Sequence, residues 1–278
     1  MLKSIGYIGY GFVGKACHES FKHNATAIIV DPKYSTTTIT EMVAENPELI
    51  FVSINAPTLD DRTVDCSLIY SIFKQLADLA YNGIVVLKST VPPDTAHDLY
   101  EKFGNWLALG KVGPLRYVYS PEFLREATWQ HDANHPQMII LAGDGNDCNE
   151  LENIYKRHSH VKCEKYAIMD YKEAALAKYT INSFLASKVV FMNQIYRVYS
   201  DVYGQYPDDA VWDYFTHVIS QDTRFGDSHL KVPGHEGALG YGGNCFPKDV
   251  KAFIGFDKHN RLSVLTEVEQ ANTKLRIS

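Results

Sequence analysis

The sequence predicts an α/β protein: a Rossmann-type, mostly parallel sheet followed by a long helix and an all-α domain. Three observations carry this prediction. Short apolar runs alternate with helical stretches as far as residue 143, residues 170–203 contain neither Gly nor Pro, and only shorter helical stretches follow. Strands that are apolar on both faces and alternate with helices are typical of parallel sheets covered by helices.

The strands are predicted from apolar runs bounded by turn residues. A helix is expected directly after the first run, over 11–23, and another over 67–82. Because helical stretches separate several of the runs, β-α-β units are favoured. The predicted strands are 4–9, 26–31, 49–54, 83–89, 116–120 and 137–143.

A helix of unusual length is predicted next, over about 171–203. Asp170, with Glu173 three residues later, resembles a helix start, and Gly204 resembles a stop. At 1.5 Å per residue this helix is about 50 Å long, so we expect a spine between domains or subunits. Shorter helices are expected over 207–220, 247–260 and 263–276.

The change of pattern near residues 165–172 predicts two domains. Residues 1–169 form the sheet domain, and residues 170–278 form the helical domain. With 278 residues, 45% hydrophobic and 22% charged, the chain has ample material for two cores.

Composition argues against several classes of protein. A net charge of −6 and the lack of a Lys/Arg-rich tract argue against nucleic-acid binding. No apolar run is long enough to span a bilayer, and no signal peptide precedes the first strand. The five cysteines are scattered and form no C-x-x-C pair, so neither disulfides nor a metal site is expected. We therefore expect a cytoplasmic protein without a membrane partner.

The segment "GYGFVG" has G-x-G-x-x-G spacing between a predicted strand and a predicted helix. Such glycines let the backbone turn and approach a pyrophosphate at the helix N-terminus. Asp31 ends the second strand, where a carboxylate binds ribose hydroxyls and favours NAD over NADP, although Lys33 lies close by. The alternative is a glycine-rich turn that binds no nucleotide.

A cysteine, Cys245, lies in the glycine-dense segment 240–249, "GYGGNCFPKD". A buried structural thiol is the alternative to a nucleophile. Lys178 and Asn182, four residues apart on the long helix, share a face with Ala174 and Ala186, so that face is expected to be partly buried. The alternative for Lys178 is a solvated lysine on an exposed stripe.

Two more segments place polar residues after strands, where ligand sites of α/β sheets gather. "SPEFLREA" (120–127) carries Glu122 and Glu126, and "KSTVPPDT" (88–95) carries Thr90. Structural alternatives exist: Glu126 could pair with Arg125, and Thr90 could cap a helix.

Together these segments resemble a known family. "IGYGFVG", "INAPT", "KSTVPP", "SPEFLREA", "KYTINSFLASKVVFMNQ", "DTRFG" and "GYGGNCFPKDV" occur in the order found in the UDP-glucose/GDP-mannose 6-dehydrogenases, the nucleotide-sugar dehydrogenases. The likeness runs from residue 4 to about 276 and is closest to the UDP-glucose 6-dehydrogenases.

The resemblance implies NAD-dependent, four-electron oxidation of a nucleotide sugar at C6, such as UDP-glucose to UDP-glucuronate. Cys245 matches the nucleophile that forms a thiohemiacetal and then a thioester. The other implied catalytic residues are Lys178 and Asn182 at the reacting oxygen, Asp249 ordering water, Glu122 activating water for hydrolysis and Thr90 positioning a water near the nicotinamide.

The resemblance also implies the binding residues. The implied NAD contacts are Gly9, Tyr10, Gly11, Phe12, Val13, Gly14, Asp31, Lys33, Asn55, Pro57, Thr58, Ser89, Thr90, Glu126 and Lys248. The implied substrate contacts are Glu122, Phe123, Leu124, Lys178, Asn182, Arg224, Lys231, Gly240, Tyr241 and Gly242, of which Arg224 reaches the neighbouring subunit's substrate in family dimers.

Family members continue into a third, C-terminal domain near the point where this sequence ends, so we expect a natural short form, a truncated piece or half of a split enzyme with a separate C-terminal partner. A homodimer through the long helix is also implied. Three other functions stay open: oxidation of GDP-mannose or another nucleotide sugar, a reductase like the β-hydroxyacid dehydrogenases, and a non-catalytic nucleotide-sugar-binding protein. The β-hydroxyacid dehydrogenases lack the G-G-x-C-F-P-K-D segment, and the intact set of reactive residues argues against a binding protein.

Overall fold

The computed structural model describes residues 2–105, 114–125 and 128–277. It divides into two compact units: unit 1 comprises Met1–Pro57 and Val64–Lys178, and unit 2 comprises Thr58–Thr63 and Tyr179–Ser278. The division falls inside the long helix rather than at its start, because Ala174 and Ala175 are buried in the core of unit 1.

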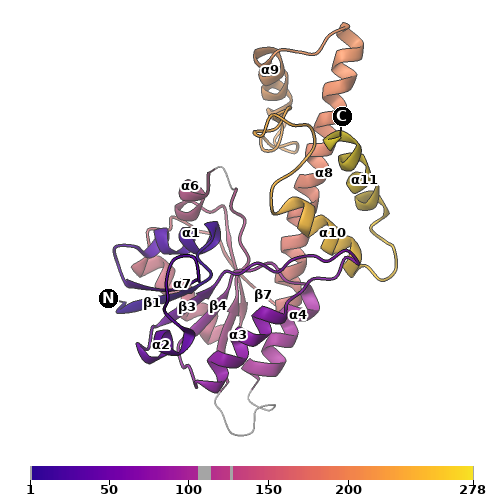
Figure 1. Cartoon of the computed structure of the whole chain (residues 1–278). Coiled ribbons are helices and arrows are strands. Elements are labelled where there is room, and N and C mark those ends of the chain that lie inside the picture. Colours follow the sequence, from indigo (N-terminus) through magenta and orange to yellow (C-terminus); the bar gives the residue numbers. More distant parts are fainter. Residues whose placement is uncertain (1, 106–113, 126–127, 278) are drawn as a thin grey trace. The chain divides into compact units, whose positions relative to one another are not determined.

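Unit 1 is built on a seven-stranded sheet of order β2-β1-β3-β4-β5-β6-β7 (Figure 1). Neighbouring strands are parallel except β5 and β6, which confirms the mostly parallel sheet. The sequence did not indicate β7, a short and only partly buried edge strand. The strands are β1 (Ser4–Ile8), β2 (Thr26–Val30), β3 (Leu49–Val52), β4 (Ile84–Leu87), β5 (Arg116–Tyr119), β6 (Ile139–Gly143) and β7 (Tyr166–Met169).

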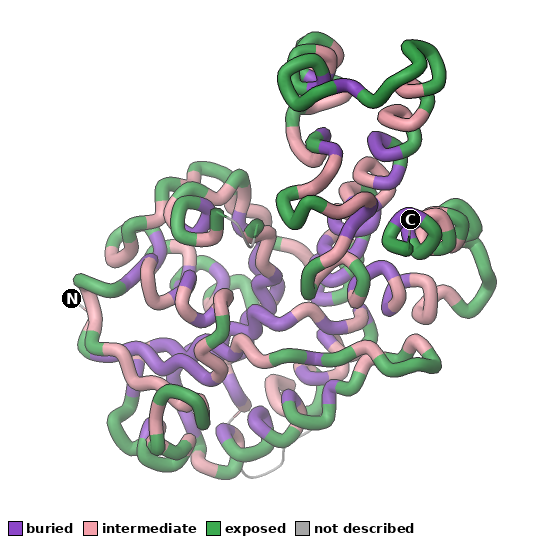
Figure 2. Tube along the Cα trace, turned by 45° about the horizontal axis from the view of Figure 1, so that its top comes forward, coloured by how far each residue is buried: buried purple, intermediate pink, exposed green. Residues whose placement is uncertain are grey.

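Helices cover both faces of this sheet, and the central strands are buried on both sides (Figure 2). One core joins the sheet to α2, α3, α4 and the start of α8, and the other joins it to α1 and α7. Alternate residues of β4 enter opposite cores, as the two-residue period of a strand requires. The helices of this unit are α1 (Phe12–Phe21), α2 (Ile39–Ala44), α3 (Ser67–Asp78), α4 (Pro93–Leu99), the short π-helix η1 (Tyr100–Gly104), α6 (Trp129–Asn134) and α7 (Gly145–His158).

The predicted long helix is confirmed as α8 (Tyr171–Tyr203), 33 residues long. The Glu173 carboxylate accepts the Asp170 backbone N–H at its start, and Gly204, with φ +69°, follows its end. The helix predicted over 67–82 stops earlier, at Asp78, because Ala80 adopts φ +52°, which leaves the helical region.

Unit 2 contains the rest of α8 together with α9 (Asp209–Ser220), α10 (Phe246–Phe256) and α11 (Ser263–Arg276). Its core contains Met192 and Trp212, and the Trp212 indole donates to the Leu230 carbonyl at 3.1 Å. The helix expected to reach residue 260 ends at Phe256, since the Asp257 carboxylate accepts the N–H groups of a following turn. In the part of the chain that the structure describes, every helix is too short or too polar to span a bilayer.

Candidate functional site

The glycine-rich segment 9–14, which we call the phosphate loop, connects β1 to α1. Gly9 has φ +83°, and a Cβ there would lie 2.6 Å from the Ser53 carbonyl oxygen. A Cβ on Gly14 would lie 2.2 Å from the Gly9 carbonyl oxygen, so helix and loop pack too closely for a side chain. A Cβ on Gly11 would meet nothing within 4 Å. The fold therefore requires glycine at positions 9 and 14, whereas Gly11 leaves open space beside the backbone.

This open space lies at the start of α1. Gly11 is the N-cap residue of α1 and supplies no side-chain cap, so the helix N-terminus is suited to an anion. The Asp31 carboxylate accepts the Tyr10 backbone N–H at 2.7 Å and the Lys33 N–H at 2.9 Å. The donor set thus fits a dinucleotide, with a pyrophosphate at the helix and a ribose near Asp31.

Aromatic side chains line the region beside Asp31. The Tyr10 hydroxyl is hydrogen-bonded to His18 Nδ1, and burial lowers the pKa of His18. Tyr34 meets Tyr10 edge-on, with ring centroids 5.4 Å apart, and its hydroxyl accepts from Lys15 at 3.0 Å. Neither His18 nor Tyr34 was among the residues predicted from the sequence.

The remaining predicted cofactor residues of unit 1 follow β3 and β4. Asn55 and Pro57 are exposed after β3. Ser89 is buried after β4 and donates to the Ile54 carbonyl at 2.6 Å, which ties the two strand ends together. Thr90 is half-buried beside it. Glu126 lies outside the described residues.

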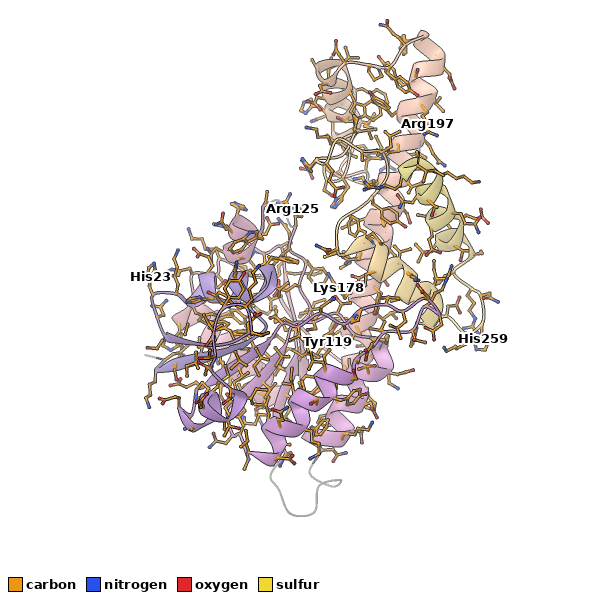
Figure 3. All side chains as sticks on the ribbon, viewed as in Figure 1. His23, Tyr119, Arg125, Lys178, Arg197 and His259 are labelled. Carbon is orange, nitrogen blue, oxygen red and sulfur yellow. The ribbon has the colours of Figure 1, made fainter. Side chains whose placement is uncertain are left out.

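Two buried lysines meet at Glu122, just beyond the end of β5. Lys88 Nζ lies 2.5 Å from the Glu122 carboxylate and donates to Ser120 Oγ at 3.0 Å. Lys178 donates to the Glu122 backbone carbonyl and lies over the Phe123 ring, 5.1 Å from its centroid. Figure 3 labels Lys178 on α8 and Tyr119, the last residue of β5. The burial of Lys178 rules out the solvated lysine that the sequence left open.

In unit 2, the predicted residues around Cys245 form a network on α10. Cys245 is half-buried and is the N-cap residue of α10, where helix backbone dipoles favour a negative charge. Asp249 is 1% exposed; its carboxylate accepts from Asn182 at 2.6 Å and from Lys248 at 2.5 Å. Thr58 donates to the Lys248 carbonyl at 3.1 Å. The structure thus brings four predicted residues together around the turn that starts at Cys245.

Two asparagines that were not predicted from the sequence hold the glycine-rich segment before Cys245 by hydrogen bonds. Asn193 on α8 accepts the Gly240 N–H at 3.0 Å. Asn272 on α11 accepts the Tyr241 N–H at 2.7 Å and donates to its carbonyl at 3.1 Å. Gly240 has φ +73°, and a Cβ there would lie 2.5 Å from Asn272. A buried asparagine that serves a distant backbone has no local sequence signal, which is why both were missed.

Arg224 and Lys231 stand apart from this network. Arg224 is 89% exposed and forms a bidentate pair with Asp222. Lys231 is exposed. Among the described residues, neither has a hydrogen bond to Asn182, Lys248 or Asp249.

Both parts of the chain match domains of one known protein family. Residues 21–159 match the NAD-binding domain of the UDP-glucose/GDP-mannose dehydrogenase family, and residues 172–274 match its central domain. The chain is 31% identical over 253 residues to UDP-glucose 6-dehydrogenase of Pseudomonas aeruginosa, which covers 86% of this chain and 51% of that protein. It spans about half the length of the curated relatives first compared.

Solved structures share the fold. A UDP-glucose dehydrogenase from Pyrobaculum islandicum superimposes with a TM-score of 0.74 at 22% identity, covering 100% of this chain and 68% of that one. A Mycobacterium tuberculosis 3-hydroxyisobutyrate dehydrogenase gives 0.66 at 13% identity, covering 99% and 94%. The fold alone therefore does not separate these two classes, but the matched domains do: the chain belongs to the UDP-glucose/GDP-mannose dehydrogenase family.

Proposed function

We propose that this protein oxidises a nucleotide sugar at C6 to the carboxylate, with UDP-glucose as the preferred substrate. The relatives named UDP-glucose 6-dehydrogenase support this choice of sugar. The observation that carries the proposal is the buried Asp249 carboxylate, one helical turn after Cys245 and held by Asn182 and Lys248. A simple alcohol dehydrogenation needs no thiol, whereas oxidation past the aldehyde benefits from a covalent intermediate.

In this proposal Cys245 is the nucleophile. Its thiolate adds to the carbonyl carbon of the intermediate aldehyde and forms a thiohemiacetal. Loss of hydride from that carbon gives a thioester, and water then releases the carboxylate and returns the thiol. The half-buried position of Cys245 at the start of α10 supports this role, since thiolates are favoured at helix N-termini.

Polar side chains on α8 and α10 would handle charge and protons. We assign Lys178 and Asn182 the role of stabilising negative charge on the reacting oxygen. Asp249 would exchange protons with an ordered water, and its two hydrogen-bonded oxygens fix its orientation. Glu122 would activate the water that hydrolyses the thioester, and Thr90 would position a water on the cofactor side.

NAD, when bound, accepts the hydride in each of the two oxidations. The phosphate loop and Asp31 would hold it, because Gly11 leaves space for the pyrophosphate and the Asp31 carboxylate can accept from a ribose. The other residues that we assign to cofactor binding are Lys33, Asn55, Pro57, Thr58, Ser89, Thr90 and Lys248; those for the sugar nucleotide are Phe123, Leu124, Arg224, Lys231, Gly240, Tyr241 and Gly242.

A substrate panel tests the proposal. UDP-glucose, GDP-mannose, UDP-N-acetylmannosamine and small hydroxy acids are each offered with NAD, and NADH is followed by absorbance. We expect turnover with UDP-glucose that Cys245→Ala abolishes. Turnover of hydroxy acids alone, undisturbed by Cys245→Ala, would favour the hydroxyacid dehydrogenase class. Tight binding of UDP-glucose and NAD without NADH would favour a binding protein.

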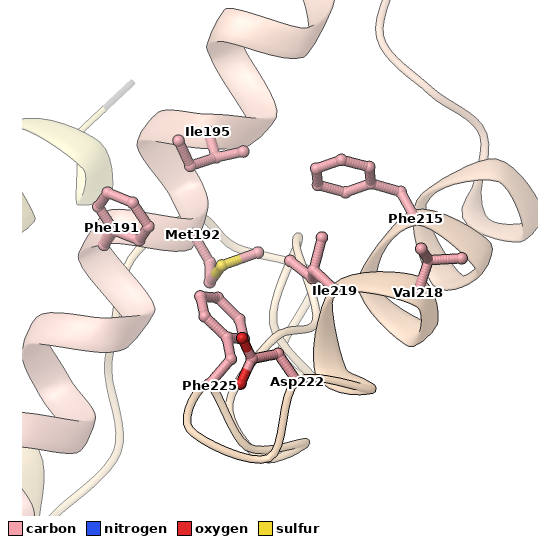
Figure 4. Close-up of a pocket in the computed structure, with 8 residues that line it drawn as sticks. All are labelled: Phe191, Met192, Ile195, Phe215, Val218, Ile219, Asp222 and Phe225. Carbon is pink, nitrogen blue, oxygen red and sulfur yellow. The ribbon is translucent and has the colours of Figure 1, made fainter.

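We also propose a homodimer formed through α8. Phe184 is 66% exposed and Phe191 is 50% exposed on this helix. An apolar pocket of about 470 Å³ lies between α8 and α9 (Figure 4). Large exposed apolar side chains of this kind mark association surfaces. Sedimentation should show a dimer, which Phe184→Glu together with Phe191→Glu weakens; a wild-type monomer at all concentrations would refute it.

A further inference from the structure

We propose that Lys88 is a positioning residue that holds the Glu122 carboxylate in place for hydrolysis of the thioester. This inference rests on the proposed function, since it concerns the step assigned to Glu122. Lys88 has no part in the steps assigned to Cys245, Asp249 and Glu122, and its place in the sequence, beside Ser89 and Thr90, gave no indication of a role.

Lys88 is fixed by the sheet itself. It directly follows β4, and its backbone N–H donates to the Val52 carbonyl at 2.8 Å. In the parallel pairing of β4 with β5, Leu87 lies beside Tyr119, so Lys88 and Ser120 leave the sheet as neighbours. The backbone therefore places the Lys88 ammonium at the point where the chain leading to Glu122 leaves β5.

The ammonium of Lys88 is almost completely buried. Its side chain is 4% exposed, and its Nζ lies 2.5 Å from Glu122 Oε1 and 3.0 Å from Ser120 Oγ. The Lys248–Asp249 pair, with side chains 21% and 1% exposed, is comparably closed. Exposed pairs differ: in Lys74–Asp78, the lysine and aspartate side chains are 68% and 62% exposed. Lysine is rarely buried without a partner, and removing one member of a buried pair is strongly destabilising. A purely structural contact between two strands needs no such charge.

Lys88 forms an ion pair with the Glu122 carboxylate, and other groups lie near it. Lys178, on α8, donates to the Glu122 backbone carbonyl, which fixes the main chain at that residue. The Cys17 thiol, on α1, stays neutral, because burial, and next the Glu122 charge, raise its pKa to about 12. Glu122 itself keeps a 22% exposed side chain, so it is open to water on one side. Lys88 thus fixes a carboxylate that can still contact solvent.

The test separates hydrolysis from oxidation. Purified wild type, Lys88→Met and the conservative Lys88→Arg are mixed with NAD and UDP-glucose in a stopped-flow instrument. For Lys88→Met we expect a burst of two NADH per active site, and then a steady state at least tenfold slower than wild type. The Cys245 peptide of quenched samples should carry the sugar acyl adduct, and KM for UDP-glucose should change little. Lys88→Arg should restore most of the steady-state rate.

Other results would overturn the proposal. If burst and steady state fall together in Lys88→Met, without adduct, Lys88 has only a structural role. If the steady-state rate of Lys88→Arg is as low as that of Lys88→Met, a positive charge beside Glu122 does not determine the rate of hydrolysis. Wild type that forms no NADH with any nucleotide sugar would instead refute the proposed function.

Thermal denaturation tests the pair independently of activity. Lys88→Met, Glu122→Gln and the double variant form a double-mutant cycle. We expect Lys88→Met to lower Tm clearly more when Glu122 is present than in the Glu122→Gln background. Additive shifts in Tm would show that the two side chains are not coupled and would overturn the assignment even for an inactive protein.

Discussion

The phosphate loop of unit 1 and the Cys245 segment of unit 2 are built in different ways. The loop depends on the backbone: Gly9 turns it, Gly14 permits close packing and Gly11 leaves space. The Cys245 segment depends on side chains that are distant in sequence, as Asn182 and Asp249 show. The backbone site is therefore specified by local spacing, whereas side-chain contacts such as those of Asn193 and Asn272 become visible only when the fold brings the residues together.

Thiol reactivity should separate the two regions most strongly. Burial raises the pKa of Cys17, in the core on α1, to about 12, so about one thiol in 10⁴ is ionised at pH 8. Cys245 is half-buried at a helix N-terminus. Iodoacetamide should alkylate Cys245 at least about a thousandfold faster than Cys17 in the native protein. Peptide mass spectrometry measures both rates; equal rates would show that Cys245 is not activated.

Turnover should be sensitive to the change of a single side-chain atom near Cys245. Asp249→Asn keeps the shape but removes the charge that Lys248 and Asn182 contact. We expect kcat to fall about a hundredfold or more, as for loss of a proton-transfer group, with NAD affinity little changed. Asp213→Asn, at an exposed position on α9, is the matched control. An unchanged kcat in Asp249→Asn would remove Asp249 from the mechanism.

The phosphate loop should be sensitive to the addition of a single methyl group at one glycine. Gly11→Ala should fold normally, since its Cβ meets nothing within 4 Å, yet lose about tenfold or more in NAD affinity. Gly14→Ala, in contrast, should lower the free energy of unfolding by about 1–3 kcal/mol, because its Cβ clashes with the Gly9 carbonyl. Calorimetric titration with NAD and thermal melts measure the two effects. Full NAD affinity in Gly11→Ala would contradict the assignment of this space to the pyrophosphate.

A weaker effect is expected from pH, through His18, which is hydrogen-bonded to Tyr10 of the phosphate loop. Because burial lowers the pKa of His18 in the folded chain, the unfolded chain binds the proton first as pH falls. Stability should therefore fall as pH drops below the ordinary value of 6.5, by less than about 1 kcal/mol because solvent screens this half-buried group. His18→Gln should flatten the dependence of Tm on pH between 7.5 and 5.5. An identical dependence in both proteins would exclude His18 as its source.

Much of the fold was predictable because its signals are local. The apolar runs of the six predicted strands and the long helix 171–203 agree with the structure. Strand β7 was missed, since a four-residue edge strand with partly exposed side chains lacks the apolar run of a central strand. Lys88 was missed as a contact of Glu122, because a lysine in the sequence indicates an exposed position, and only strand pairing shows that it is buried.

The number of NADH molecules formed per sugar shows whether the protein carries out a four-electron oxidation through Cys245. Limiting UDP-glucose is consumed completely by the purified protein with excess NAD, beside a Cys245→Ala control. We expect two NADH per UDP-glucose and none sustained in the variant. One NADH per sugar, or the same yield without Cys245, would contradict a four-electron oxidation through a thioester.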